Sequence, residues 1–220
     1  MGRLFLLYCC PAEIPVSIQK DPAGMWDERY SRDELVYGDS PNTFLRTYAV
    51  NLKPDAKVLV PGDGYGRNGL WLARQGFRVH TVDVSSVGVE RARKNAAAAG
   101  VKMQIEQGDL TTWNWPESQF DAVASIFVHM LPVDRQIAHA GMLRTAKPGG
   151  VMILQAFSPA QLQYTSGGPK QLDLLYTAEM LRRDFASAEI VELKETVAHL
   201  NEGRLHSGKG AVVQGIFRKK

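Results

Sequence analysis

The sequence predicts a single α/β domain: a doubly wound, mostly parallel sheet of seven strands, with helices on both faces and an antiparallel C-terminal strand. Three observations lead to this fold class. From residue 57 onward, short apolar runs alternate with helical patterns, which is typical of a parallel sheet. Runs such as Val151–Leu154 are continuously apolar, as expected for strands buried on both faces. The last two apolar runs have no helical pattern between them, which indicates an antiparallel pair.

Each element is expected from its own local pattern. In chain order they are strand Lys57–Pro61, helix Asn68–Gln75, strand Phe77–Val82, helix Val87–Ala99, strands Lys102–Glu106 and Phe120–Phe127, helix Val133–Ala146, strand Val151–Phe157, helix Thr177–Phe185, and strands Glu189–Leu200 and Ala211–Arg218. Glycines end the first two helices at Gly76 and Gly100, and Lys147–Gly150 ends the third. The second strand alternates apolar and polar residues with a period of two.

The composition is that of an ordinary globular protein. The chain has 220 residues, of which 45% are hydrophobic and 22% are charged, so disorder and fibrous repeats are excluded. A formal net charge of +3 is too small to indicate a nucleic acid or an anionic membrane as partner. The two cysteines, Cys9 and Cys10, are adjacent and unsuited to cross-linking a fold, which favours a reducing, cytoplasmic location.

Residues 1–24 are expected to be a leader in front of a domain that comprises residues 25–220. The apolar run Leu4–Cys10 is too short to span a membrane, which takes about 18 or more apolar residues. No small-residue cleavage site follows it, so a secretory signal is not indicated. The leader is interpreted as a floppy extension, or as the product of an upstream start codon with Met25 as the native start.

Three glycines, Gly62, Gly64 and Gly66, connect the first predicted strand to the helix that follows. Glycine allows a sharp turn and a close approach of a ligand, and the helix N-terminus offers unpaired N–H groups. Asp83 ends the second strand about 20 residues after the first glycine, where a carboxylate can accept hydrogen bonds from both ribose hydroxyls. Together these residues predict a nucleoside-binding site.

The pattern leaves two cofactors open. Residues Gly64–Gly69 also satisfy the G-x-G-x-x-G pattern of NAD-binding proteins. Asp109, however, follows the third strand, where its carboxylate can accept a hydrogen bond from the amine of adenine. The antiparallel C-terminal pair is also unlike a dinucleotide-binding half-fold. Both features favour S-adenosylmethionine, while a NAD-dependent oxidoreductase and a catalytically silent nucleotide-binding module stay as alternatives.

Short motifs follow one another in a distinctive order along about nine-tenths of the chain. They are Trp26–Tyr30, Tyr37-Gly38, Pro41-Asn42, Gly62–Asn68, Val82–Ser85, Asp109-Leu110, Lys147–Gly150, Gly167–Pro169 and Asn201–Gly203. In this order they resemble the thiopurine S-methyltransferase and tellurite-resistance group of class I methyltransferases. The chain departs from the commonest methyltransferase loop at Val60, where an acid is usual, and carries Asp63 inside the loop instead.

The resemblance implies that S-adenosylmethionine is the cofactor and that an N-terminal lid covers it. The residues expected to contact it are Trp26, Gly62, Asp63, Gly64, Gly66, Asn68, Asp83, Val84, Asp109, Leu110 and Phe127. In the lid, Trp26, Tyr30 and Tyr37 offer aromatic faces that can stabilise a sulfonium through cation–π contact, or they pack an ordinary helix.

The resemblance further implies methyl transfer to a small, soft nucleophile: a thiol, a selenium compound or a tellurium compound. Such an acceptor is already nucleophilic as an anion near neutral pH, so no strong general base is required. The protein then mainly has to hold the acceptor about 3 Å from the methyl carbon, in line with the leaving sulfur. The alternative is an O- or N-methyltransferase for a small metabolite, which would need a base.

Three residues are candidates for contact with the acceptor. His129 follows the fourth strand and can orient the substrate or take a proton, or it can be a packed histidine. Arg67 begins a helix, where a cation is unfavourable unless an anion lies nearby, so it can bind an anionic substrate. By the resemblance, His206 lies near a functional histidine. No residues have metal-ligand spacing, so no metal is expected, and the protein is predicted to be a monomer or weak homo-oligomer.

Overall fold

The computed structural model describes residues 21–32 and 34–220. Residues 1–20 of the expected leader, with Cys9 and Cys10, lie outside the described residues. The helix α1 begins at Pro22, with the side chain of Asp21 accepting a hydrogen bond from the backbone N–H of Ala23, so the end of that leader belongs to a helix.

The structure confirms the predicted fold class. Seven strands form one sheet in the order β3-β2-β1-β4-β5-β7-β6, and β7 runs antiparallel to both of its neighbours. The strands are β1 Lys57–Pro61, β2 Arg78–Asp83, β3 Met103–Gln107, β4 Phe120–Ile126, β5 Ala146–Phe157, β6 Ala188–Asn201 and β7 Ser207–Lys219. The α-helices are α1 Pro22–Tyr30, α2 Thr43–Ala49, α3 Arg67–Arg74, α4 Ser86–Ala98, α5 Pro132–Thr145 and α6 Ala178–Asp184. Two 3-10 helices, η1 Pro159–Gln163 and η2 Leu172–Leu174, follow β5.

Two hydrophobic cores lie on opposite faces of this sheet. Successive residues of a strand point to opposite faces, so Val58 packs with α2 and α3 while its neighbour Leu59 packs with α5 and α6. Both residues are fully buried. Burial on both faces explains why these strands read as continuous apolar runs in the sequence.

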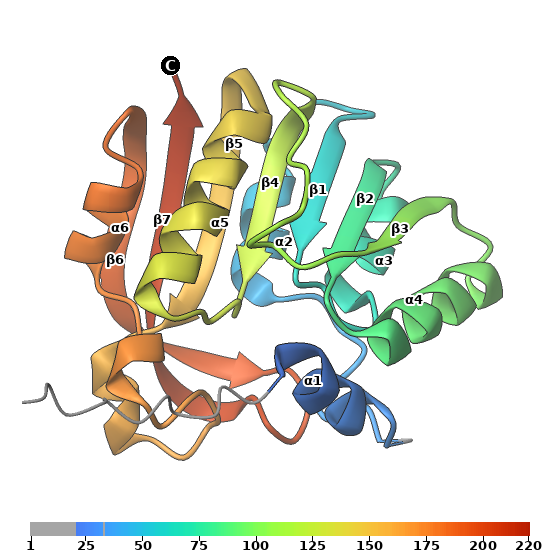
Figure 1. The fold of residues 1–220 in the computed structure, drawn as a ribbon, viewed down its shortest axis with the longest axis horizontal. Helices are drawn as coiled ribbons and strands as arrows, with labels where there is room; N and C mark the ends of the chain where they lie inside the picture. Colours follow the sequence, from blue (N-terminus) through green and yellow to red (C-terminus); the bar gives the residue numbers. More distant parts are fainter. Residues whose placement is uncertain (1–20, 33) are drawn as a thin grey trace, which may run out of the picture.

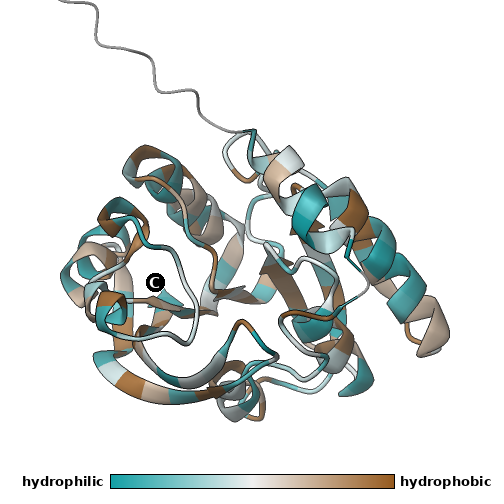
Figure 2. Ribbon diagram, turned by 90° about the horizontal axis from the view of Figure 1, so that it is seen from below, coloured by the Kyte–Doolittle hydropathy of each residue, from teal (hydrophilic) through white to brown (hydrophobic). Residues whose placement is uncertain are grey.

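Helix α1 belongs to neither layer. In Figure 1 it lies below β1, β2 and β4, across the carboxyl ends of these strands. The end of β6 and the start of β7 lie at the same edge. Figure 2 shows the molecule from this edge, with helices that mix hydrophobic and hydrophilic residues, as expected for helices buried on one side. In an open α/β sheet, ligands bind beyond these carboxyl ends.

Two predicted boundaries are wrong at the C-terminal half. The segment Lys147–Gly150, expected to be a loop, lies within β5, because Ala146 already pairs with Phe120 and a register shift absorbs the extra residues. The connection between the last two strands is shorter than expected and spans residues 202–206. Gly208 and Gly210, which fall between the two predicted strands Glu189–Leu200 and Ala211–Arg218, lie in β7 and pair with Leu200 and Ala198 of β6.

Candidate functional site

The glycine loop between β1 and α3 turns through three glycines with positive φ angles, 67° at Gly62, 57° at Gly64 and 88° at Gly66. Residues with a side chain rarely adopt this conformation. At Gly64 there is also no room, because a Cβ would lie 2.4 Å from the hydroxyl oxygen of Tyr30. The space beside Gly64 is thus filled by the Tyr30 side chain, and the buried loop packs against α1 at the carboxyl edge of the sheet.

Asp63 points back into this loop. Its carboxylate accepts hydrogen bonds from the backbone N–H groups of Asn68 (3.2 Å) and Gly69 (2.9 Å), at the start of α3. Burial raises the pKa of Asp63 to about 7, against the opposing effect of these two donors. This geometry differs from the expected cofactor contact: Asp63 holds the loop against α3, and both of its oxygens face the helix.

Asp83 ends β2 directly beside the loop. One carboxylate oxygen accepts from the N–H of Gly64 at 2.7 Å and the other from the N–H of Ser85 at 2.9 Å. A carboxylate has about four acceptor sites, so two backbone donors leave capacity for hydroxyl groups of a ligand. Burial raises the pKa of Asp83, and the two backbone donors oppose this shift by favouring the ionised form. The geometry fits a carboxylate fixed in place to bind a ribose.

The end of β3 brings Asp109 and Leu110 to the same edge, because the N–H of Gly108 donates to the carbonyl oxygen of Asp83 at 2.9 Å. Asp109 is exposed, and its Oδ1 accepts hydrogen bonds from both the N–H and the hydroxyl of Thr111. Oδ2 has no partner among the residues that the structure describes, so it is open to an amine. Leu110 is buried and Val84 half-buried.

Helix α1 is fastened over this edge by contacts with α4 and with the glycine loop. The carboxylate of Asp27 accepts hydrogen bonds from the Ser85 hydroxyl (2.5 Å) and the Val87 N–H (3.2 Å) at the start of α4. The Tyr30 ring packs against Gly64 and is stacked on Trp26, with 5.4 Å between the ring centroids. The expected lid residues therefore lie next to the loop and Asp83.

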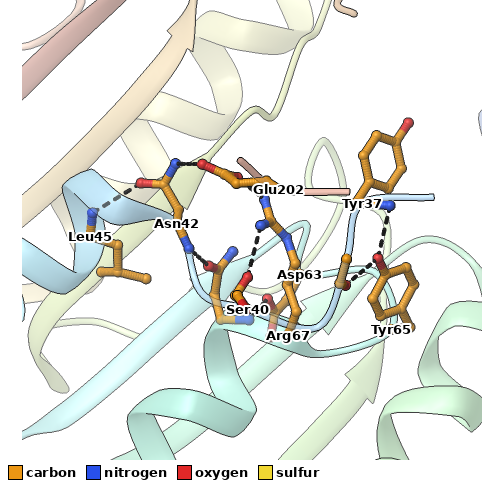
Figure 3. A network of polar contacts seen from close by, with 10 residues as sticks. Tyr37, Ser40, Asn42, Leu45, Asp63, Tyr65, Arg67 and Glu202 are labelled. Atoms are coloured by element: carbon orange, nitrogen blue, oxygen red, sulfur yellow. Dashed lines mark hydrogen bonds and ion pairs between the residues drawn. The ribbon is translucent and has the colours of Figure 1, made fainter. Parts of the chain in front are cut away.

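Arg67 does not reach an open site. Its guanidinium forms a buried ion pair with Glu202 (2.5 Å) and donates to the carbonyl oxygen of Ser40 at 3.1 Å (Figure 3). The second oxygen of Glu202 accepts from the side-chain amide of Asn42 at 2.7 Å. The side chain of Asn68 accepts from the N–H of Asn42 at 2.9 Å. The anion that the sequence predicts beside Arg67 is thus Glu202, from the chain itself.

This buried network joins three distant parts of the chain: the segment after α1, the start of α3 and the connection between β6 and β7. Asn42 and Glu202 belong to motifs noted in the sequence, but sequence reasoning missed their role. In the sequence, Asn201–Gly203 is typical of an ordinary turn. Only the structure shows that Glu202 is buried, 2% exposed, and that it forms an ion pair.

A cluster of four rings lies beside the glycine loop: Tyr37, Phe127, Phe157 and His206. The His206 ring is 4.8 Å from Tyr37, 4.5 Å from Phe127 and 5.3 Å from Phe157, measured between centroids. Phe127 has a φ of 56°, unusual for a residue with a side chain, and its neighbour Val128 lies against Gly62. Sequence reasoning missed Phe157, which reads as the end of a buried strand.

The two candidate histidines differ in their surroundings. In His129, Nδ1 lies 2.6 Å from the carbonyl oxygen of Leu174 and Nε2 accepts from the N–H of Phe157 at 3.3 Å. In His206, Nδ1 is buried and has no hydrogen-bond partner among the described residues. Burial lowers the pKa of His129 to about 4 and that of His206 to about 3, where Arg67 adds to the effect. Both imidazoles are neutral at neutral pH.

Residues 58–150 match the family model described as a methyltransferase domain. This span contains the glycine loop, Asp83 and Asp109, together with the strands from β1 to the start of β5. Residues 58–150 are thus a methyltransferase domain. The match confirms S-adenosylmethionine as the predicted cofactor in preference to NAD, and the spare acceptor capacity of Asp83 fits its nucleoside.

Relatives of this methyltransferase domain differ widely in length. A protein-L-isoaspartate O-methyltransferase of Methylorubrum populi is 30% identical over 155 residues, which cover 68% of this chain and 65% of that protein. An uncharacterized protein of Mycobacterium bovis is 27% identical over 104 residues, 47% of this chain. The chain spans only 38% of the length of that relative.

Solved structures share the fold over most of the chain. TehB from Haemophilus influenzae has a TM-score of 0.68 at 18% identity, with 90% of this chain and 67% of that chain covered. A structure concerned with the conversion of a disulfide bond into a thioacetal group in echinomycin biosynthesis has a TM-score of 0.74 at 20% identity, covering 90% and 93%. Within residues 21–32 and 34–220, no helix has the length and apolar character to cross a membrane. The same residues hold no group of three or more His, Cys, Asp or Glu that could bind a metal.

Proposed function

We propose that the domain transfers the methyl group of S-adenosylmethionine to a small, soft nucleophile: a thiol, a selenium compound or a tellurium compound. In this reaction the bond between the methyl carbon and the sulfonium sulfur breaks as the bond to the acceptor atom forms in line with it. A thiol acceptor gives up its proton to solvent before the attack, because it reacts as the anion.

The cofactor contacts proposed here follow the carboxyl edge of the sheet. Asp83 accepts hydrogen bonds from the ribose hydroxyls, and Asp109 accepts one from the adenine amine. Val84 and Leu110 supply apolar contacts beside the ring, and Trp26 closes the site from α1. When bound, S-adenosylmethionine supplies an electrophilic methyl group on a positively charged sulfur. The glycine loop lies between these contacts and Phe127, which belongs to the aromatic cluster.

The aromatic cluster is suited to hold a cation without a counter-charge. The faces of Tyr37 and Phe127 can stabilise a sulfonium through cation–π contact, and such contacts strengthen where water is excluded. Phe157 is buried and stacks on Phe127 and His129, so it supports the cluster from behind. The positive charge of Arg67 is compensated by Glu202. The unpartnered Nδ1 of His206 can form a hydrogen bond with the acceptor and so fix its position.

The choice of acceptor depends on one observation: the imidazoles of His129 and His206 provide no effective base near neutral pH. The Nε2 lone pair of His129 is occupied by a backbone N–H, and the pKa values of His129 and His206 are about 4 and 3. A hydroxyl or amine acceptor has to lose a proton and benefits from a base with a pKa near the working pH. A thiolate or another chalcogen anion needs no such base.

The test is methyl transfer from labelled S-adenosylmethionine to matched acceptors that differ only in the reacting atom. Thiophenol, phenol and aniline form such a set, extended by hydrogen sulfide, a thiopurine, and selenite or tellurite with a thiol reductant. We expect label in the sulfur, selenium or tellurium products, with capture of the volatile ones, and none in those of phenol and aniline. Label only in an oxygen or nitrogen product would overturn the proposal. A cytoplasmic location and a monomeric or weakly associating state stay predictions.

A further inference from the structure

A groove of about 380 Å³ lies beside α2, over the part of the sheet formed by β5, β7 and β6. It shares no residue with the aromatic cluster. Asn42 and Glu202 of the buried network line one end of it, which separates it from the glycine loop. Its volume is within the range of small-molecule sites, about 300–1,000 Å³.

The floor of this groove contains two glutamines from neighbouring strands, Gln155 of β5 and Gln214 of β7, which face each other in the strand register. They are only 2% and 9% exposed. The side-chain amide of Gln214 donates to the side-chain carbonyl oxygen of Gln155 at 2.8 Å. The other half of each amide, Nε2 of Gln155 and Oε1 of Gln214, has no partner among the described residues.

The two unpaired groups are a donor and an acceptor on neighbouring side chains. This does not depend on how the amides are oriented, because turning both of them still leaves one NH₂ group and one carbonyl oxygen unpaired. Both glutamines line the groove, so these groups can bind water or a ligand there. A ligand that pairs with both of them must present an acceptor and a donor, as an amide or lactam edge does.

The walls of the groove add shape and charge. Phe44 and Tyr48 of α2 form an aromatic side, with 4.9 Å between their ring centroids. On the β6 side, Lys194 donates to Glu192 at 2.7 Å, so these two charges compensate each other. An aromatic wall beside a paired charge favours a flat and uncharged ligand.

We propose that this groove is a second small-molecule site, which binds a neutral, planar molecule through an amide or lactam edge. The ligand accepts a hydrogen bond from one glutamine amide and donates one to the other, while its ring packs against Phe44 and Tyr48. The proposal does not depend on the methyl acceptor, because the groove and the aromatic cluster have no residue in common.

The test uses the full chain and uracil as the probe, with 1,3-dimethyluracil as the matched control that lacks N–H donors. Uracil should shift the side-chain amide resonances of Gln155 and Gln214 in ¹⁵N-resolved spectra, and 1,3-dimethyluracil should bind about tenfold more weakly or worse, as expected for lost hydrogen bonds. This measurement on the unmodified chain does not depend on the folding of any variant.

The variants Gln155→Leu and Gln214→Leu should each weaken uracil binding at least about tenfold, whereas Val133→Ala, at an exposed position on α5, should leave it unchanged. The double variant Gln155→Leu with Gln214→Leu removes both partners of the buried bond and is expected to fold well. Binding of uracil to the double variant with unchanged affinity would overturn the proposal. So would unshifted glutamine resonances in the unmodified chain, or equal binding of the two probes.

Discussion

The buried ion pair between Arg67 and Glu202 is expected to be essential for attaching the lid segment to the domain. Both side chains are almost fully buried, 8% and 3% exposed, and Glu202 uses both oxygens, one for Arg67 and one for Asn42. In Glu202→Gln only one acceptor oxygen remains, and a donor NH₂ must face either Arg67 or Asn42. Removing one partner of a buried pair leaves an uncompensated charge, which costs about 3–5 kcal/mol.

A matched control lies nearby in the same two segments. Glu34 and Arg204 form an ion pair of similar geometry, at 2.7 and 3.1 Å, but their side chains are 52% and 62% exposed. Solvent screens exposed pairs, so Glu34→Gln should leave the free energy of unfolding nearly unchanged. Urea unfolding measures the free energy of unfolding of both variants. A loss below about 1 kcal/mol in Glu202→Gln, equal to that of the control, would refute the buried pair.

Three further predictions address the loop, the lid and the imidazoles. Asp83→Ala should weaken S-adenosylhomocysteine binding by about 1–3 kcal/mol in calorimetry, more than the same change at the exposed Asp109, and equal losses would contradict the ribose assignment. Gly64→Ala places a Cβ 2.4 Å from the Tyr30 hydroxyl, so limited proteolysis should cut α1 faster than in the unmodified chain, and an unchanged rate would speak against this contact. The pKa of His206 falls from 6.5 to about 3 on folding, so the native state binds fewer protons than the unfolded state between these values, and stability is lost as the pH falls below about 6.5. In His206→Asn, the free energy of unfolding should fall less steeply between pH 6 and pH 4.5, by about 1.4 kcal/mol per pH unit. An identical slope in the two proteins would mean that His206 is protonated in the native state.

Local patterns predicted the fold well and also predicted which strand ends lie at one edge of the sheet. The glycine loop, Asp83 and Asp109 follow three strand ends, and parallel strands bring such ends to one edge, so their proximity follows from topology alone. The alternation of apolar runs also located β1, β2, β3 and β4 within one or two residues.

The partners of the candidate residues could not be predicted in the same way. Arg67 and Glu202 are 135 residues apart, and Asn42 and Glu202 are 160 apart, so no local pattern records these contacts. Arg67 was correctly recognised as a cation in need of an anion, but the anion comes from the chain. The occupied nitrogens of His129 depend on Leu174 and Phe157, which enter its surroundings only through tertiary packing.

The pH dependence of kcat/KM tests whether the acceptor ionises without help from the protein. Methyl transfer to two aryl thiols of clearly different pKa is measured across the pH range with the same preparation. We expect the rising limb of each profile to follow the pKa of the thiol used and to move when the thiol is changed. A single inflection at the same pH for both thiols would reveal a base of the protein and would overturn the proposed transfer to an acceptor that ionises by itself.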